Sequence, residues 1–137
     1  MTSKINRVSV LIFNDNKFVL IFRHKNNEDY YAIPGGGIEL NETPEQAAIR
    51  EIDEELALKL NNLQLISETN TTDRHDHLFT AKTSDFEFII TGSEKKHLND
   101  PENLFKPLWL DKNSLEQTIP VYPEPFRKIF NEIINKL

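Results

Sequence analysis

The sequence predicts an α+β fold in which a mixed β-sheet is flanked by helices, an α/β/α sandwich. Apolar, β-branched segments lie on both sides of one strongly marked helix signal, and a second amphipathic helix signal closes the chain. The 137 residues match the size of one domain, and 38% hydrophobic with 28% charged residues is typical of a globular protein. We therefore expect residues 1–137 to form a single domain.

The segments before the helix have the pattern of a hairpin. Residues 7–13 are apolar on both faces, which is typical of a central strand. Asn14, Asp15 and Asn16 form a turn signal, and residues 18–23 would return as the second strand. Residues 25–29 are polar and predict a loop. Residues 30–33 predict a short extended segment, because Pro34 disfavours helix at the residue before it.

The main helix is expected at residues 43–58. Thr43 is the expected N-cap, Pro44 would take the first helical position, and Gln46 would complete a capping box. Small residues on the acidic face, Ala47 and Ala48 among them, would let a ligand approach. The buried stripe would consist of Ile49, Ile52 and Leu56.

The second half of the chain predicts four strands and a terminal helix. The strands are expected at residues 62–67, 77–82, 85–91 and 104–110. Pro107 makes the last of them an edge or bulged strand, since proline cannot donate a ladder hydrogen bond. The terminal helix is expected at residues 125–136, with an apolar stripe of Phe126, Ile129, Phe130, Ile133 and Leu137.

Composition excludes several classes of function. The chain has no cysteine, which excludes disulfides, thiolate metal sites and a cysteine nucleophile. The longest apolar stretch, residues 8–13, is too short to span a bilayer, and the N-terminus has no signal-peptide core. We expect a soluble, cytoplasmic protein with no membrane partner.

The negative charge is concentrated in one segment. Residues 39–55 carry seven acids and one base, whereas the rest of the chain is neutral, and the total is −6. Without a basic stripe, duplex nucleic acid is not an expected partner. A local excess of carboxylates instead favours a divalent cation. Three of the four glycines, Gly35, Gly36 and Gly37, directly precede this segment, which indicates a special backbone conformation there.

Three carboxylates of the main helix share one face. Glu51, Glu54 and Glu55 are spaced i, i+3 and i+4. Charges about 6 Å apart repel by about 3 kcal/mol per pair at an effective dielectric of about 20. A solvated acidic face is the simpler alternative, but such faces usually carry lysines at i+4, and solvation does not require the preceding glycines.

These residues resemble the Nudix box, GX5EX7REUXEEXGU. The match consists of Gly36, Glu42, Arg50, Glu51, Glu54 and Glu55 at the family's spacing. Residues 33–39 and 43–48 are similar to the usual lead-in and helix start. The usual glycine near the helix end is Ala57 here. An alanine disfavours the left-handed turn that stops a helix, so we expect the helix to run at least to Leu58.

The resemblance implies the Nudix fold and a metal-dependent hydrolase that cleaves the pyrophosphate bond of a nucleoside diphosphate linked to another moiety. Mg²⁺ or Mn²⁺ would be held by Glu51, Glu54, Glu55 and the carbonyl of Gly35. Glu51 and Glu54 would be catalytic, with Glu51 handling the proton of the attacking water. Arg50 would hold the carboxylates in position. The partner would be a small nucleotide, and the protein a monomer or homodimer.

Several further residues are candidates with simpler alternatives. Arg23 could bind a substrate phosphate or be a surface arginine, and Gly36 and Gly37 could line the substrate. Either Glu94 or Glu102 could complete the metal site. Supporting carboxylates could be Glu39 and Glu42, although Glu42 could also simply favour the helix N-terminus. The remaining candidates are His75 and His77 for a metal, without a third histidine nearby, and Tyr30, Tyr31, Phe79 or Trp109 for stacking on a base, although each is more often a core residue.

A non-catalytic Nudix-like module that binds a nucleotide metabolite is the rival interpretation. A sensor need not keep Arg50, Glu51, Glu54 and Glu55 together, and this chain keeps all four. A calcium-binding or purely structural acidic helix would not explain the glycines. The substrate stays open among nucleoside triphosphates, nucleotide sugars, dinucleoside polyphosphates and capped RNA ends.

Overall fold

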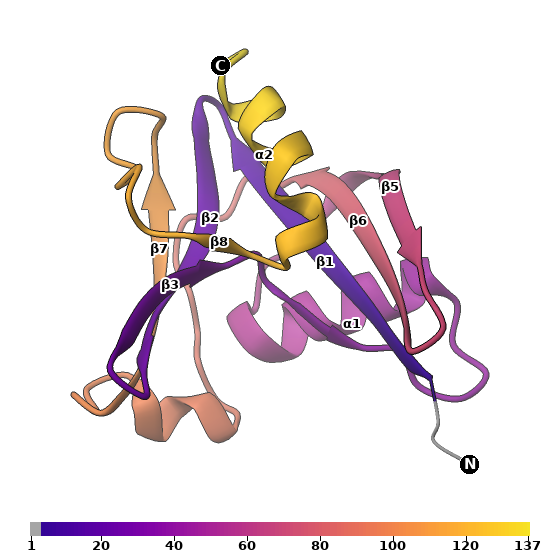
Figure 1. Ribbon diagram of the computed structural model, residues 1–137, viewed down its shortest axis with the longest axis horizontal. Helices are drawn as coiled ribbons and strands as arrows, with labels where there is room; N and C mark the ends of the chain where they lie inside the picture. The colour runs from indigo at the N-terminus through magenta and orange to yellow at the C-terminus, as the bar shows by residue number, and fades with distance from the viewer. Residues whose placement is uncertain (1–3) are drawn as a thin grey trace.

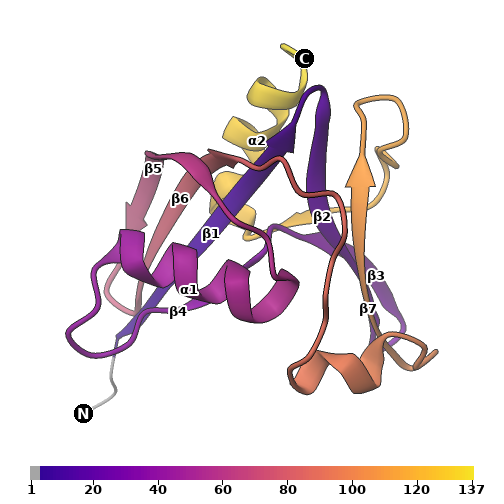
Figure 2. The same ribbon diagram turned by 180° about the vertical axis from the view of Figure 1, so that it is seen from behind.

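The computed structural model describes residues 4–137, apart from the side chain of Ser93. Eight strands form one curled mixed sheet, with helix α1 on one face and helix α2 on the other (Figures 1 and 2). The expected α+β arrangement is therefore confirmed. The elements are β1 (Ile5–Asn14), β2 (Lys17–Lys25), β3 (Glu28–Ala32), β4 (Gly35–Gly37), α1 (Pro44–Leu56), β5 (Asn61–Asn70), β6 (Arg74–Lys82), η1 (Ser93–His97), β7 (Asn103–Leu110), β8 (Val121–Tyr122), η2 (Glu124–Phe126) and α2 (Arg127–Ile134).

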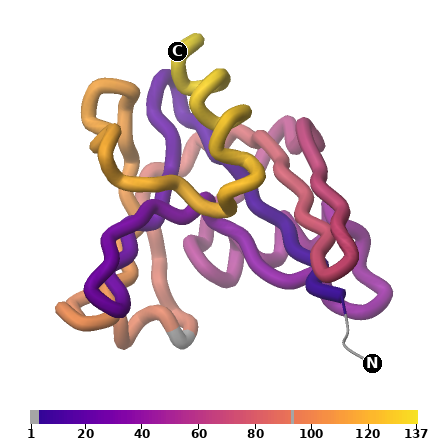
Figure 3. The backbone as a smooth tube through the Cα atoms, viewed as in Figure 1, coloured from indigo at the N-terminus to yellow at the C-terminus, as the bar shows by residue number. Residues whose placement is uncertain are grey.

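The sheet splits where β1 and β2 diverge. Their register holds only beside the hairpin turn, at Phe13 opposite Phe18 and Asn14 opposite Lys17. Beyond that point β1 pairs with β6 in parallel and with β4 antiparallel, while β2 pairs with β3 and β7. The tube in Figure 3 shows this separation of the two arms. Within residues 4–137, strand β7 pairs only with β2, so Pro107 lies on an edge strand as predicted.

Each face of the sheet carries its own apolar core. Alternate residues of β1 supply both, since Val8 and Val10 face α1 whereas Leu11 faces α2. Helix α2 contributes Phe130, which is fully buried and meets Phe18 edge to face at 5.9 Å. The sheet thus separates the packing of α2 from that of α1.

Helix α1 begins as predicted and ends earlier than predicted. The side chain of Thr43 accepts from the backbone of Gln46, and Gln46 returns the capping-box hydrogen bond. The helix ends at Leu56, because Ala57 takes the left-handed conformation with φ 57° and ψ 36°. The expected run to Leu58 is wrong. The turn places Leu58 in the core at 1% exposure, and that burial offsets the strain at Ala57.

The buried face of α1 also differs from the expected stripe. Ile52 and Leu56 are fully buried, but Ile49 is 53% exposed. Ala47 and Ala48 are fully buried instead. These small side chains therefore let α1 lie close to the sheet, and they do not form an open surface beside the carboxylates.

Residues 85–91 do not form the predicted strand. The segment bonds to the end of α1, because the backbone N–H of Ile89 donates to Leu56 O at 3.0 Å. The carboxylate of Asp85 accepts from the Lys59 N–H, also at 3.0 Å. Phe88 stacks on Trp109, with ring centroids 5.9 Å apart. The segment therefore caps the helix and packs two phenylalanine rings against Trp109 of β7.

Two further differences concern short elements. The expected loop at residues 25–29 is a tight turn, since Asn26 and Asn27 both have positive φ and the strands run up to them. The glycine run is the strand β4, and no glycine among residues 4–137 has a positive φ. The two-residue strand β8 was not predicted. No helix in this part of the chain has the length and apolar character needed to span a membrane.

Candidate active site

The site forms where α1 lies against β4. Glu51 sits directly over Gly36: a methyl group built on Gly36 would lie 2.2 Å from the carboxyl carbon of Glu51. A methyl group on Gly35 would lie 1.9 Å from the carbonyl oxygen of Val8 on β1. Glycine is therefore required here for close approach and not for a left-handed turn. Gly37 has open space on the same test.

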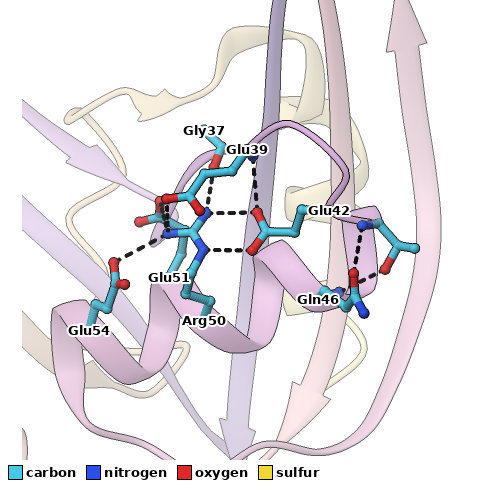
Figure 4. A network of polar contacts seen from close by, with 8 residues as sticks. Gly37, Glu39, Glu42, Gln46, Arg50, Glu51 and Glu54 are labelled. Carbon is cyan, nitrogen blue, oxygen red and sulfur yellow. Dashed lines mark hydrogen bonds and ion pairs between the residues drawn. The ribbon is translucent and has the colours of Figure 1, made fainter.

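Arg50 connects the carboxylates of α1 to the segment before the helix (Figure 4). Its Nε and one terminal nitrogen donate to the two oxygens of Glu42 at 2.6 and 2.8 Å. The other terminal nitrogen donates to Glu51 Oε1 at 2.9 Å and to Glu54 at 3.2 Å. A fifth hydrogen bond reaches the carbonyl of Gly37 at 2.9 Å. All five N–H donors of the guanidinium can be used in this way.

The network fixes the ionisation of its members. The hydrogen bonds from Arg50, with one from the Glu39 N–H, lower the pKa of Glu42 to about 2. The carboxylates raise the pKa of Arg50, chiefly through Glu42. Glu39 approaches the guanidinium at 3.6 Å and is mostly exposed. Arg50 directly precedes Glu51, so its backbone lies about 100° around the helix from the carboxylate face. Its long side chain nevertheless reaches across to Glu51 and Glu54. The acidic face therefore does have a nearby cation.

Glu55 differs from Glu51 and Glu54, which both accept a hydrogen bond from Arg50. Burial raises the pKa of Glu55 to about 8, and the charges of Glu94 and Glu51 raise it further, against smaller opposing effects of Arg7 and Arg23. The structure thus brings Glu94 of η1 close to the box. Glu102 is exposed, and its N–H donates to Asp100 at 3.0 Å.

Arg23 lies on β2 on the other side of the site. One terminal nitrogen donates to Asn103 at 2.5 Å, and the guanidinium lies 5.5 Å from the ring centroid of Phe105. Its Nε is buried without a hydrogen-bond partner among residues 4–137. A buried N–H donor of this kind costs about 1–3 kcal/mol when unpaired, so the geometry favours an oxygen-rich ligand there.

The donor set fits a divalent cation. Helix α1 carries three carboxylates, and Arg50 holds two of them, Glu51 and Glu54, through one terminal nitrogen. Carboxylate oxygens are the ligands that Mg²⁺ and Mn²⁺ prefer. Burial favours the protonated form of Glu55. A bound cation would replace that proton and stabilise the carboxylate. The arrangement can therefore bind a hard metal ion and an anionic ligand at adjacent points.

The other predicted residues lie elsewhere. His75 and His77 lie on β6 beside Glu68 of β5, and β1 separates them from β4. Tyr31 and Phe79 are buried in the two cores, and Tyr30 meets Tyr122 edge to face at 5.5 Å.

A cavity of about 400 Å³ opens on the α2 face of the sheet next to β4. Its wall combines two arginines with apolar and aromatic groups: Arg7, Ser9, Ala32, Ile33, Arg74, Tyr122, Pro123, Glu124 and Pro125. Ser9 and Arg7 pair with Gly35 and Gly37 across the β1–β4 ladder. Sequence reasoning missed this cavity, because it depends on the approach of β8 to the end of β3.

The family model for the NUDIX domain matches residues 4–130. The chain therefore belongs to the NUDIX family, which confirms the resemblance and, at the level of the family, the expectation of a Nudix enzyme. An RNA pyrophosphohydrolase of Acinetobacter baylyi is 28% identical over 142 residues, covering 92% of this chain and 85% of the relative. An ADP-ribose pyrophosphatase of Methanocaldococcus jannaschii is 42% identical over 97 residues, covering 68% of this chain and 55% of the relative.

Solved structures agree on the fold. A NUDIX-family hydrolase from Clostridium perfringens has a TM-score of 0.69 and 22% identity, with 99% of each chain covered. A MutT NUDIX hydrolase from Burkholderia pseudomallei also has a TM-score of 0.69, with 20% identity and 96% and 98% of the two chains covered. At these identities the likeness shows the fold alone, and it confirms the α+β class.

Proposed function

We propose that the protein is a Mg²⁺- or Mn²⁺-dependent hydrolase that cleaves the pyrophosphate bond of a nucleoside diphosphate linked to another moiety. The observation that carries the proposal is the Arg50 network, whose five hydrogen bonds tie Glu42, Glu51 and Glu54 to the backbone of Gly37. A purely solvated acidic face would not need such a device. Membership of the NUDIX family supports the same conclusion.

Each residue of the site has a proposed role that follows from its position. Glu51, Glu54, Glu55 and the carbonyl of Gly35 would hold the cation. A divalent ion there would neutralise the pyrophosphate and acidify a water. Glu51 Oε1 is held by Arg50, and we assign Oε2 to the proton of the attacking water. Glu54, which also accepts from Arg50, would orient that water.

The substrate would bind through groups that the network leaves accessible. Arg23 would attract a phosphate by its positive charge, and Asn103 and Phe105 hold its guanidinium in place. Gly37 has open space where a side chain would be, so a phosphate can approach its backbone. Gly36 acts through Glu51, whose carboxylate fills the space beside it.

The relatives suggest two classes of substrate to test first. The names of those relatives point to RNA that carries a pyrophosphate and to ADP-ribose, both of which contain a phosphoric anhydride. Nucleoside triphosphates, nucleotide sugars and dinucleoside polyphosphates complete the set to compare.

A hydrolysis panel tests the proposal. The full chain is incubated with each compound and with Mg²⁺, Mn²⁺ or excess EDTA, and products are resolved by phosphorus NMR. We expect cleavage of the anhydride in at least one compound, loss of activity with EDTA and recovery with either metal. Glu51→Gln is the matched inactive control. Tight binding of a nucleotide with no turnover under any metal would support the rival sensor instead.

A further inference from the structure

A cluster of one carboxylate and two imidazoles lies on the β5–β6 hairpin, outside the site described above. Glu68 of β5 is the register partner of His77 on β6, and His75 lies two residues before His77 on the same face. One ligand atom from each of Glu68, His75 and His77 lies within 4.8 Å of the other two. The sequence showed the two histidines, and the fold adds the carboxylate.

The hydrogen bond of His77 determines which of its nitrogens is free to bind a cation. His77 is 5% exposed, and its Nδ1 lies 3.2 Å from the carbonyl oxygen of Arg7. A carbonyl can only accept, so Nδ1 carries a proton, and in the neutral imidazole Nε2 then holds the lone pair. Metal-binding histidines are typically oriented by such a bond from the other ring nitrogen.

The lone pair of His77 points at another acceptor. Nε2 of His77 lies 3.7 Å from Glu68 Oε2, which also lies 2.6 Å from Nε2 of His75. Two acceptors that face each other require a cation or a proton between them. Lys4, which precedes β1, bonds the side chain of Asn70 on β5. Among residues 4–137, the ion pairs of Glu68 are with these two histidines.

We infer that Glu68, His75 and His77 form a second metal site, specific for a transition metal such as Zn²⁺ and chemically distinct from the Mg²⁺ site of the box. Imidazole ligands favour Zn²⁺, whereas Mg²⁺ requires oxygen ligands. Tetrahedral zinc places its ligands about 3.3 Å apart, given metal–ligand bonds of about 2.0–2.2 Å. Small side-chain rotations bring the three atoms to that spacing. Glu68 is 49% exposed, so the fourth position is open to water.

The site would join an edge strand to the sheet next to the proposed active site. In the described part of the chain strand β5 pairs only with β6, and a metal bound to both would cross-link them. His77 and Gly36 both pair with Val8, from opposite sides of β1. Two strand spacings, about 10 Å, therefore separate the backbones of His77 and Gly36.

Calorimetric titration of the full chain with Zn²⁺ in excess Mg²⁺ tests this inference, since excess Mg²⁺ would compete with Zn²⁺ for the oxygen ligands of the box. We expect one Zn²⁺ per chain and a rise in Tm. His75→Gln and Glu68→Gln should each weaken Zn²⁺ binding by at least about tenfold, the lower limit for losing even a supporting partner of a metal ligand. His24→Gln is the matched control, because His24 also pairs with a carboxylate, Asp29 at 2.5 Å, but has no second histidine beside it.

Histidine NMR and Co²⁺ absorption supply independent readouts. Zn²⁺ should shift the Nε2 resonances of His75 and His77 and leave those of His24 and His97 unchanged. Co²⁺ should give the intense visible bands of tetrahedral coordination in the wild type and in His24→Gln only. Equal Zn²⁺ affinity in all variants, or equal shifts at all four histidines, would overturn the inference.

Discussion

Arg50 shows how much of the proposed site depends on the shape of one side chain. Its five donors reach two oxygens of Glu42, one each of Glu51 and Glu54, and the carbonyl of Gly37. Lysine keeps the charge but has three donors and no planar fork. We expect Arg50→Lys to lower kcat at least about tenfold with little change in KM, because misplacement by 1 Å can cost about a hundredfold.

The control for this prediction is Arg50→Ala, which removes the charge as well. Both variants leave the carboxylates present but misplaced, so added Mn²⁺ should restore part of the rate. Steady-state kinetics over a Mn²⁺ titration measure this. A kcat for Arg50→Lys equal to that of the wild type would show that only the charge of Arg50 matters.

Glu51 should respond differently from Arg50. Glu51→Gln keeps the hydrogen bond from Arg50 and the fit against Gly36 but loses charge and basicity. General-base assistance contributes about 10²–10⁴-fold, and the loss of a metal ligand adds to it. We expect the rate to fall at least about a thousandfold with little change in substrate binding, and Mn²⁺ should not restore it. A residual rate above about a tenth would move the base to Glu54, Glu55 or Glu94.

Ala57 is strained by its left-handed backbone. Its φ of 57° costs an alanine about 1–2 kcal/mol relative to glycine, part of which the greater freedom of glycine in the unfolded chain offsets. We expect Ala57→Gly to stabilise the protein by about 1 kcal/mol, which raises Tm by about 3–5 °C. Ala48→Gly, inside the helix, should lower Tm in the same assay. A lower Tm for Ala57→Gly would mean that contacts of its methyl group outweigh the strain.

Single residues differ in how far the sequence determines their roles. The common face of Glu51, Glu54 and Glu55 follows from helical spacing, so it could be predicted. The left-handed Ala57 could not, because the burial of Leu58 decides it. Similarly, the pairing of Glu68 with two histidines depends on the register between β5 and β6.

At the scale of elements, the segment before α1 and the helix itself are held together by charge. Glu42 precedes the helix, and Arg50 lies two turns into it. The pKa of Glu42 falls from 4.5 to about 2 on folding, so the unfolded chain binds more protons between those values. The stabilisation from this carboxylate is complete above about pH 4.5 and disappears as pH falls through about 2.

Thermal unfolding from pH 7 to pH 2 checks this prediction. Glu42→Gln should lower Tm at pH 7, and the difference from the wild type should shrink as pH falls below 4.5. Glu45→Gln removes an exposed carboxylate from the first turn of α1 and should change Tm less. A difference that stays constant down to pH 2 would contradict the ionic origin of the effect.

A helix or strand could be predicted where its local sequence pattern agrees with the hydrogen-bond partners that the fold supplies. The β1–β2 hairpin, α1 and the edge strand β7 carry their own turn, capping and proline signals. Residues 85–91 have the pattern of a strand, but their backbone hydrogen bonds go to the end of α1. A run of three glycines does not have the pattern of a strand, yet Gly35–Gly37 pairs with β1. A side chain on Gly35 would collide with Val8, and one on Gly36 would collide with Glu51.

At the scale of the whole molecule, the sheet should insulate the site from one of the two cores. Ile52 and Ile134 are both buried, at 0% and 2% exposure, one beneath α1 and the other beneath α2. The same truncation, Ile→Ala, costs about 2–5 kcal/mol at either position. Ile52 directly follows Glu51 on the helix that carries all three carboxylates, whereas Ile134 packs on the opposite face.

We therefore expect Ile52→Ala and Ile134→Ala to lower Tm by similar amounts but to differ in catalysis. Ile52→Ala should lower kcat by about tenfold or more, because a cavity under α1 lets Glu51 shift against Gly36. Ile134→Ala should keep the wild-type kcat wherever it is folded, since the cavity opens on the far side of β1. Both are assayed well below their Tm, with circular dichroism confirming the folded fraction. Equal losses of kcat would mean that the sheet transmits strain between its faces, and the two cores would then have to be treated as one mechanical unit.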